Sequence, residues 1–300
     1  RFQSIKPADD VYTRAMDDIL AMINHTGAPA TGQRAIRTLG LAVKGDSDGL
    51  NASQVDILRQ SITSDLDRFI MTMASTLKFS FEHDGTAYAE LPSPLIQEIV
   101  TAMSYVFRTP EYAVAMSQES IECCLREAVD ALLDDRLDTT KGAPTGVGSL
   151  VKTINKLAMR AAVSPPLEIS LLALLSLQTS IIQNNPDKGR AARVLTKLFH
   201  KVTKDEREQN PTNPLGGVSS WDALLRSLDW LLQIVEKARL EGVCDGILKH
   251  STEMSKDLMT ELVTCKGGDF IQNAVVLLEL PNGGSLLQKL LVTCVQDTEG

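Results

Sequence analysis

Apolar residues recur with a period of about 3.6 along most of the chain, and this pattern constrains the fold more than any other feature. In the range 94–107, for example, Leu95, Ile99 and Val106 lie on one helical face. The same pattern predicts amphipathic helices over 94–107, 118–135, 147–161, 189–204 and 221–237, with weaker stripes over 9–24, 32–43, 62–81 and 253–264. No segment longer than about five residues alternates with a period of two. The sequence therefore predicts an all-α chain.

The segment 167–182 differs from the others because it has almost no polar face. A helix that is apolar all round packs against neighbours on several sides. We therefore expect this segment to form the central helix of the array.

The predicted helices begin about 20–30 residues apart, so antiparallel pairs would recur about every 45–50 residues. This spacing is close to the period of HEAT and armadillo repeats, which is roughly 40–47 residues. We therefore expect an α-solenoid of antiparallel HEAT-like helical repeats over 9–295, after a linker at 1–8 and with a loop insertion near 204–219. The low aromatic content, 4%, agrees with helix seams filled by aliphatic side chains.

Several helix boundaries carry their own signals. Asn51 and Thr31 have the side chains of N-caps, and Ser93 is followed by Pro94 at the first helical position. We expect Ser164, which precedes two prolines, to cap the following helix in the same way.

Charge and composition exclude some classes of protein. The chain has 30 Lys+Arg against 38 Asp+Glu, and this net charge of −8 argues against a general nucleic-acid binder. Its five cysteines have no regular spacing, which is typical of a reducing compartment. The longest apolar tract is short and interrupted by polar residues, so we expect a soluble, cytosolic chain. The sequence begins without Met and without a signal peptide, as an excised fragment would.

No segment carries a complete catalytic or cofactor motif. The segment 27–34 has the glycine spacing of a phosphate-binding loop, but Gln33 and Arg34 replace its Lys and its Ser/Thr. The glycines of 142–148 precede a helix without the strand of a dinucleotide-binding unit. The four histidines are scattered, and no metal-ligand spacing is present. We therefore predict a non-enzymatic chain with no cofactor and no metal; an all-α enzyme with a cysteine nucleophile is a remaining alternative.

Basic residues gather near the predicted inter-helix turns. In a solenoid, turns on one side align as a ridge, which often binds a partner. The candidate partner-binding residues are Arg34, Arg37, Arg136, Lys141, Lys188 and Arg190. Ordinary solvated charge is the alternative interpretation.

The order of three segments, 121–137, 148–158 and 170–182, resembles the C-terminal region of the TOG-domain microtubule polymerases. This family includes fly Minispindles and the vertebrate colonic-hepatic tumour-overexpressed protein. The resemblance extends outward through 65–81 and 256–272, and it covers roughly residues 10–295. It lies in helix order and scattered residues rather than in an invariant motif.

The resemblance implies a sixth TOG-like unit that follows the tubulin-binding array of the family. Such proteins catalyse no chemical transformation; they bind tubulin dimers and promote their addition at microtubule plus ends, in spindles, at centrosomes and at kinetochores. Their C-terminal region docks adaptors, notably transforming acidic coiled-coil proteins. The resemblance therefore implies a cytoplasmic, cytoskeletal protein without nucleic-acid or membrane partners.

One difference from the family favours adaptor docking over direct tubulin binding. Tubulin-binding TOG units of this kind carry a Trp in the first intra-repeat turn, whereas 25–31 has none. Trp221 and Trp230 lie far along the chain, and we expect both in the core. Weak tubulin binding through Arg34, Lys141 and Lys188 is the alternative function.

Overall fold

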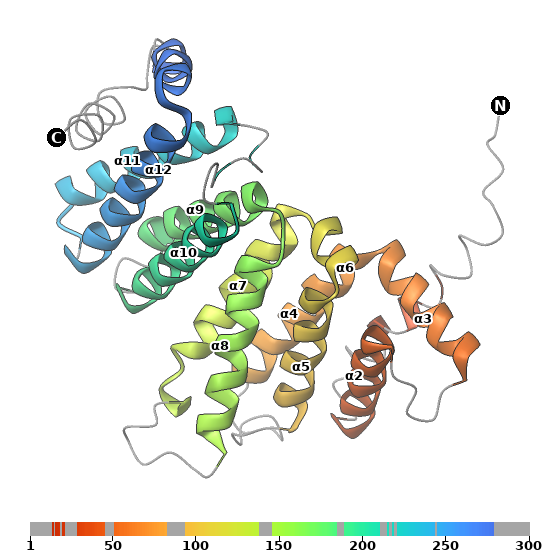
Figure 1. Ribbon diagram of the computed structural model, residues 1–300. Helices are drawn as coiled ribbons and strands as arrows, with labels where there is room; N and C mark the ends of the chain where they lie inside the picture. Colours follow the sequence, from red (N-terminus) through yellow and green to blue (C-terminus); the bar gives the residue numbers. More distant parts are fainter. Residues whose placement is uncertain are drawn as a thin grey trace, which may run out of the picture. The chain divides into compact units, whose positions relative to one another are not determined.

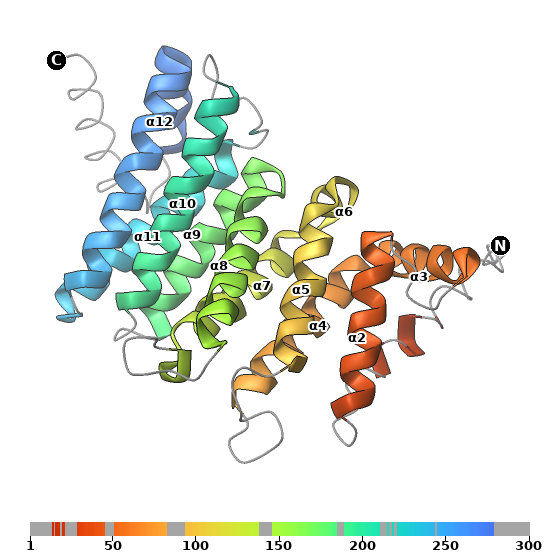
Figure 2. The same ribbon diagram turned by 60° about the horizontal axis from the view of Figure 1, so that its bottom comes forward.

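The structure is a computed structural model, and it describes residues 14, 16–18, 20–21, 29–45, 51–82, 94–137, 146–184, 189–210, 215, 218, 221–243 and 245–278 (Figures 1 and 2). All regular structure within these ranges is helical, which confirms the all-α prediction. Contacts between Cα atoms divide the chain into two compact units, Arg1–Pro165 and Pro166–Gly300. The prediction of one domain over 9–295 stays a prediction.

The first unit consists of helices in two layers. Its elements are α2 (Pro29–Lys44), α3 (Ala52–Ser64), α4 (Leu66–Glu82), α5 (Pro94–Arg108), α6 (Pro110–Ala115), α7 (Gln118–Leu132), the short 3-10 helix η1 (Asp135–Leu137) and α8 (Val147–Val163). Helix α5 packs between α2 and α8 in one layer, and α4 packs on α7 in the other. Contacts of α4 with α5 and of α7 with α8 join the layers.

The second unit repeats this arrangement. Its helices are α9 (Leu167–Asn184), α10 (Gly189–Gln209), α11 (Trp221–Leu240) and α12 (Asp245–Leu278). Helix α9 packs on α11 and α10 packs on α12, while α9 with α10 and α11 with α12 form the pairs across the layers. Helices thus pair across two layers and stack on a neighbouring pair within each layer, which is the packing of an antiparallel helical-repeat solenoid.

Aliphatic side chains fill both cores. Phe69, Phe107 and Phe199 are the only large aromatic side chains among the largest fully buried ones of the described residues; the others are Ile, Leu and Met. Helix α9 follows the prediction for an all-round apolar helix, since no residue from Leu167 to Ile182 is exposed. The polar side chain of Gln178 on α9 is fully buried, and its Nε2 donates to Ser251 Oγ of α12 at 2.7 Å.

Some helix boundaries differ from the predictions. The stripe over 62–81 contains a break, because α3 ends before Asp65 and α4 begins at Leu66. Near this break the hydroxyls of Ser61 and Ser64 donate to backbone carbonyls of α3, an interaction that competes with helix continuation. Asn51 is confirmed as the N-cap of α3, with a complete capping box through Gln54.

The N-cap predictions for Thr31 and Ser164 were wrong. Thr31 lies inside α2, which begins at Pro29, where the missing N–H of proline has no cost. Ser164 ends α8 instead of starting α9, and its N–H donates to the Arg160 carbonyl. Pro94 begins α5 as predicted, while Ser93 lies outside the described residues.

The loop insertion expected from residue 204 begins later. Helix α10 continues to Gln209, and Lys201–Asp205 and Lys204–Glu208 form ion pairs at helical spacing along its last turns. Beyond the helix, Leu215 and Val218 are buried. The polar sequence suggested a linker because helical charge pairs and linkers have similar compositions.

Substitution of Gly40 tests the close approach of α2 and α5 in the first unit. A Cβ at Gly40 of α2 would lie 3.1 Å from Ala102 Cβ and 3.2 Å from Ala102 Cα of α5. Gly40→Leu should therefore lower the free energy of unfolding by about 1–3 kcal/mol, as overpacking does. Chemical denaturation measures this loss, and Ala102→Gly in the same chain should recover part of it. An unchanged denaturation midpoint for Gly40→Leu would contradict this packing.

Candidate partner-binding surfaces

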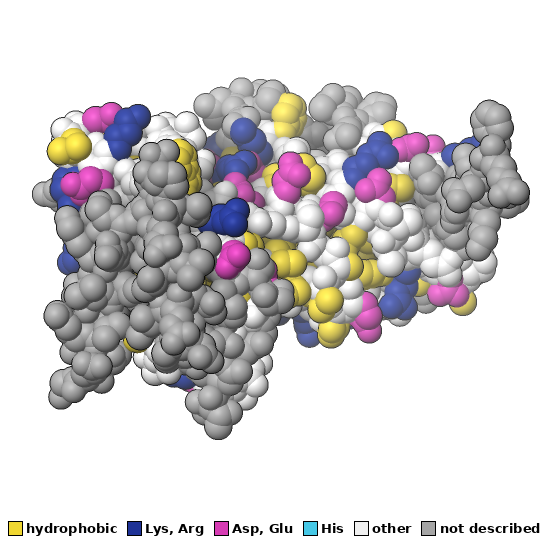
Figure 3. Space-filling view, turned by 90° about the horizontal axis from the view of Figure 1, so that it is seen from above, with side chains coloured by type: hydrophobic (Ala, Val, Ile, Leu, Met, Phe, Trp, Pro, Cys, Tyr) yellow, Lys and Arg dark blue, Asp and Glu magenta, His cyan; other side chains and the backbone are white. Residues whose placement is uncertain are grey.

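The predicted basic residues lie in different places. Arg34 and Arg37 are exposed on α2, three residues apart, and Arg190 is exposed in the first turn of α10. Lys141 and Lys188 lie outside the described residues. On the face drawn in Figure 3, Lys and Arg side chains are interspersed with Asp and Glu over the described surface. A partner-binding ridge made by these residues stays a prediction.

Arg136 is held by contacts within the first unit. Its Nε and Nη2 donate to the two carboxylate oxygens of Asp134 at 2.9 and 2.8 Å, and Nη2 also donates to the carbonyl of Phe81 at the end of α4. The guanidinium carbon lies 5.8 Å from the centre of the Phe81 ring. Arg136 therefore ties the turn after α7 to the end of α4.

The same contacts set the charge of Asp134. Partial burial raises the pKa of this carboxyl, but the side-chain and backbone hydrogen bonds from Arg136 and its positive charge outweigh burial. The net pKa of Asp134 is therefore below its usual range.

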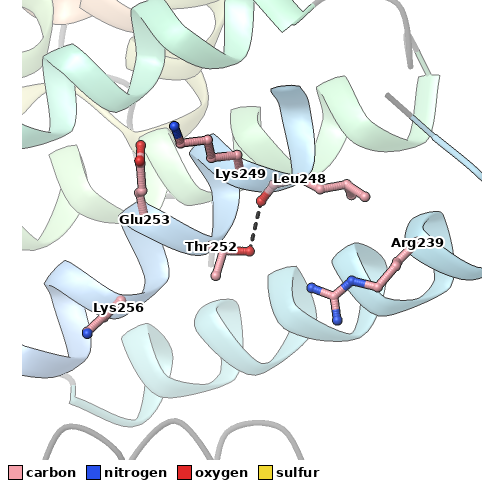
Figure 4. A pocket seen from close by; sticks show the side chains of 6 residues that line it. All are labelled: Arg239, Leu248, Lys249, Thr252, Glu253 and Lys256. Carbon is pink, nitrogen blue, oxygen red and sulfur yellow. Dashed lines mark hydrogen bonds between the residues drawn. The ribbon is translucent and has the colours of Figure 1, made fainter. Parts of the chain in front are cut away.

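A pocket of about 430 Å³ opens between α11 and α12 in the second unit (Figure 4). Arg239 comes from α11, and the other lining residues come from α12: Leu248, Lys249, Thr252, Glu253 and Lys256. In Figure 4 the Arg239 guanidinium extends toward Thr252, whose Oγ1 donates to the Leu248 carbonyl at 2.8 Å. Three cationic side chains and one carboxylate give the lining a net positive charge in a chain that is negative overall.

Two of the pocket-lining residues, Glu253 and Arg239, also form ion pairs with residues of their own helices. Glu253 lies 3.2 Å from His250 Nδ1, and Arg239 lies 2.9 Å from Glu236 one turn earlier on α11. Exposed ion pairs at helical spacing contribute little to stability, about 0.3–0.5 kcal/mol. They can therefore rearrange around a charged partner at small cost.

The outward face of α11 is a second exposed feature of this unit. Its inward face is buried, whereas Trp230 is 52% exposed and Leu240 is 81% exposed. Arg226, Gln233 and Lys237 are exposed at positions that share this outward face. The core placement expected for Trp230 was therefore wrong, and the side chain of Trp221 lies outside the described residues.

The opposite flank of α12 is fixed by contacts with α10. His200 Nδ1 lies 3.1 Å from Asp257, and Arg207 forms an ion pair with Glu261. Burial raises the pKa of Asp257, and the charge of His200 partly opposes this rise. The Thr196 hydroxyl also approaches the His250 carbonyl at 3.3 Å. These contacts hold α12 so that its pocket-lining residues keep their place.

The two described cysteines lack the features of a nucleophile. Cys124 is buried, and burial raises the pKa of its thiol strongly. Burial and the charge of Glu127 raise the pKa of the half-buried Cys123 as well. A raised pKa reduces the thiolate fraction that nucleophilic attack requires. Cys244 and the side chains of Cys265 and Cys294 lie outside the described residues.

The described residues show neither a cluster of metal ligands nor a single membrane-spanning helix. His, Cys, Asp and Glu side chains form no group of three or more that could hold a metal ion within the described ranges. No single helix in this part of the chain is long and apolar enough to cross a membrane, although α8 and α9 taken as a bent pair reach that length and composition.

The sequence analysis did not predict the exposed residues of α11 or the pocket beside α12. One feature of the sequence does indicate that Trp230 is exposed. Trp230 does not belong to the apolar stripe of Leu224, Leu228 and Leu231 that predicts the buried face of this helix. An aromatic residue off the buried stripe is expected on the surface. The pocket is formed where α11 packs on α12, and the apolar periodicity of a single helix does not predict how two helices pack.

Comparisons with protein-family models, with curated proteins and with solved structures found no match. The family suggested by the segment order is therefore argued below as a proposal.

The contacts of Asp134 predict a pH-dependent contribution to stability. Because the folded-state pKa is lowered, the contribution is present above the unfolded-state pKa of about 3.9 and is lost as pH falls through the folded value. Asp134→Asn should lower the free energy of unfolding by about 1–2 kcal/mol near neutral pH. This difference from the wild type should shrink between about pH 5 and about pH 2.

Urea denaturation at several pH values measures the effect. Asp56→Asn is the matched control, because Asp56 is exposed on α3, and it should leave the stability near that of the wild type. A difference between Asp134→Asn and wild type that is independent of pH would contradict the role of Arg136.

Proposed function

We propose that this chain is a non-enzymatic interaction module, the C-terminal TOG-like solenoid of a microtubule polymerase. It acts in spindle and plus-end organisation in the cytoplasm by docking an adaptor protein. The segment resemblance supplies the family, and the repeat packing agrees with it. The observation that carries the docking function is the half-exposed Trp230 on α11, a helix that also contributes to a basic pocket.

The chemistry of this surface fits an acidic amphipathic helix. Trp230 and Leu240 offer apolar anchors on α11, and exposed tryptophans are enriched among residues that dominate binding energy. Arg239, Lys249 and Lys256 offer positive charge at the pocket between α11 and α12. Adaptors of the transforming acidic coiled-coil class combine negative charge with helical apolar stripes, so their chemistry complements both parts of the surface.

The two parts of the surface contribute in different ways. Burial of the Trp230 side chain would supply most of the affinity, because aromatic anchors bury a large area. The cations would speed the encounter and set the orientation of the partner. Binding should therefore weaken moderately as salt rises, while a residual apolar contribution persists.

A binding assay with a transforming acidic coiled-coil protein tests this function. Trp230→Ala should weaken the complex by about 2 kcal/mol, or about thirtyfold. Met159→Ala is the matched control, because Met159 on α8 is also partly exposed, at 42%, but lies in the first unit. Equal affinities for Trp230→Ala and the wild type would place the docking surface elsewhere.

Charge reversal tests the electrostatic part separately. Lys249→Glu combined with Lys256→Glu should slow association with the acidic adaptor and remove most of its salt dependence. Lys152→Glu combined with Lys156→Glu on α8 makes the same change in net charge and should have little effect. Stopped-flow association rates at low and raised salt measure the contrast. An equal loss in both pairs would mean that only overall charge matters.

A further inference from the structure

Three cationic side chains lie at one edge of the first unit. Helices α2, α5 and α8 each carry one in the last turn, namely Lys44, Arg108 and Arg160. Helix α5 packs against both α2 and α8, and Figures 1 and 2 show the three helices side by side. Tyr105 lies one turn before Arg108, and Lys44 Nζ is 6.0 Å from the centre of its ring.

The position of each cation at a helix C-terminus accounts for that cation by itself. It does not account for the placement of three cations close together. A cation in the last turn of a helix is stabilised by the negative end of the helix dipole, by about 0.3–1 kcal/mol. Partial burial and the positive charge of Arg108 together lower the pKa of Arg160, so the two guanidinium groups repel each other. Tyr105 is the neighbour that opposes this shift.

Among the described residues, no carboxylate pairs with Arg108 or Arg160. Neither the Arg108 nor the Arg160 side chain forms an ion pair or hydrogen bond with any part of the chain that the structure describes. Arg108 is exposed and Arg160 is half-buried, so a ligand can reach both. An acidic chain that keeps Arg108 and Arg160 together without a carboxylate partner among the described residues has an edge suited to an anion.

We propose that Lys44, Tyr105, Arg108 and Arg160 form a site for the phosphoryl group of a phosphorylated serine or threonine on a partner protein. Arginine forks match the tetrahedral oxygens of phosphate in a bidentate manner, and lysine adds a point charge. The Tyr105 hydroxyl is a further donor. Arginine clusters are a recurring means of phosphopeptide recognition.

The charge of the ligand decides between a phosphoryl group and a carboxylate. A phosphorylated side chain carries about −1.5 to −2 charges and three acceptor oxygens. A carboxylate carries one charge and two oxygens, so it would leave one of the two arginine charges uncompensated. A membrane surface is a poorer fit, because polybasic lipid-binding segments typically gather about 4–8 Lys and Arg residues.

This site is independent of the adaptor surface, because it lies on helices of the first unit. Binding of a phosphorylated segment would make recruitment of a second partner depend on a kinase. Loss of either site leaves the other measurable, so failure of one proposal does not imply failure of the other.

Titration of the full chain with O-phospho-L-serine, followed by NMR of the arginine Nε–H groups, tests the site. Saturable shifts should appear for Arg108 and Arg160, and L-glutamate at equal ionic strength should bind about tenfold more weakly. Arg108→Gln and Arg160→Gln should each weaken phosphoserine binding about tenfold. Arg226→Gln on α11 is the control and should bind as the wild type does.

Two additional variants and one probe make the result decisive. Arg160→Lys keeps the charge but loses the fork, and it should lose most of the preference for phosphoserine over glutamate. Arg108 is exposed, so Arg108→Gln keeps the test valid even where a substitution of half-buried Arg160 impairs folding. An array of phosphorylated and unphosphorylated serine peptides should show binding that depends on both phosphate and Arg108.

Three results would overturn the proposal. The first is equal affinity for phosphoserine and glutamate, and the second is unchanged binding in Arg108→Gln. The third is binding to vesicles that contain phosphorylated inositol lipids without binding to any phosphopeptide on the array, which would assign the cluster to membranes.

Discussion

Burial of aliphatic side chains between neighbouring helices is the interaction on which the rest of this protein depends. Within each unit, helices pair across two layers and stack within each layer, so that their apolar stripes face neighbouring helices. Small residues allow close approach, as where Gly40 faces Ala102, and Leu, Ile and Met fill the remaining space. Some buried polar side chains inside these seams form hydrogen bonds with each other, as Gln178 does with Ser251.

This packing leaves the outward faces and the helix ends available for binding. On α11 the outward face carries Trp230 and Leu240, and the seam with α12 opens into a basic pocket. At the ends of α2, α5 and α8, the parallel placement of three helices brings three cations together. The proposed functions therefore use surfaces that the repeat packing creates and does not itself need for stability.

The periodic apolar pattern predicted the fold class and most helices, because burial of one face determines both. It missed α3 and the break at Asp65, since local hydroxyl and capping interactions decide them. It also missed the cation cluster and the pocket, because contacts between helices distant in sequence create them. Arg136 illustrates the limit: its sequence position indicated a free turn, but its partners Asp134 and Phe81 are visible only in three dimensions.

We propose that α11 and α12 form the surface that docks the adaptor. Hydrogen exchange of the full chain, measured by mass spectrometry with and without a transforming acidic coiled-coil protein, tests it most directly. Backbone amides within helices exchange through local opening, and a bound partner suppresses that opening. With the adaptor bound, amide exchange should slow in α11 and in the pocket-lining turns of α12. Protection confined to the first unit, or no protection at saturating adaptor, would contradict it.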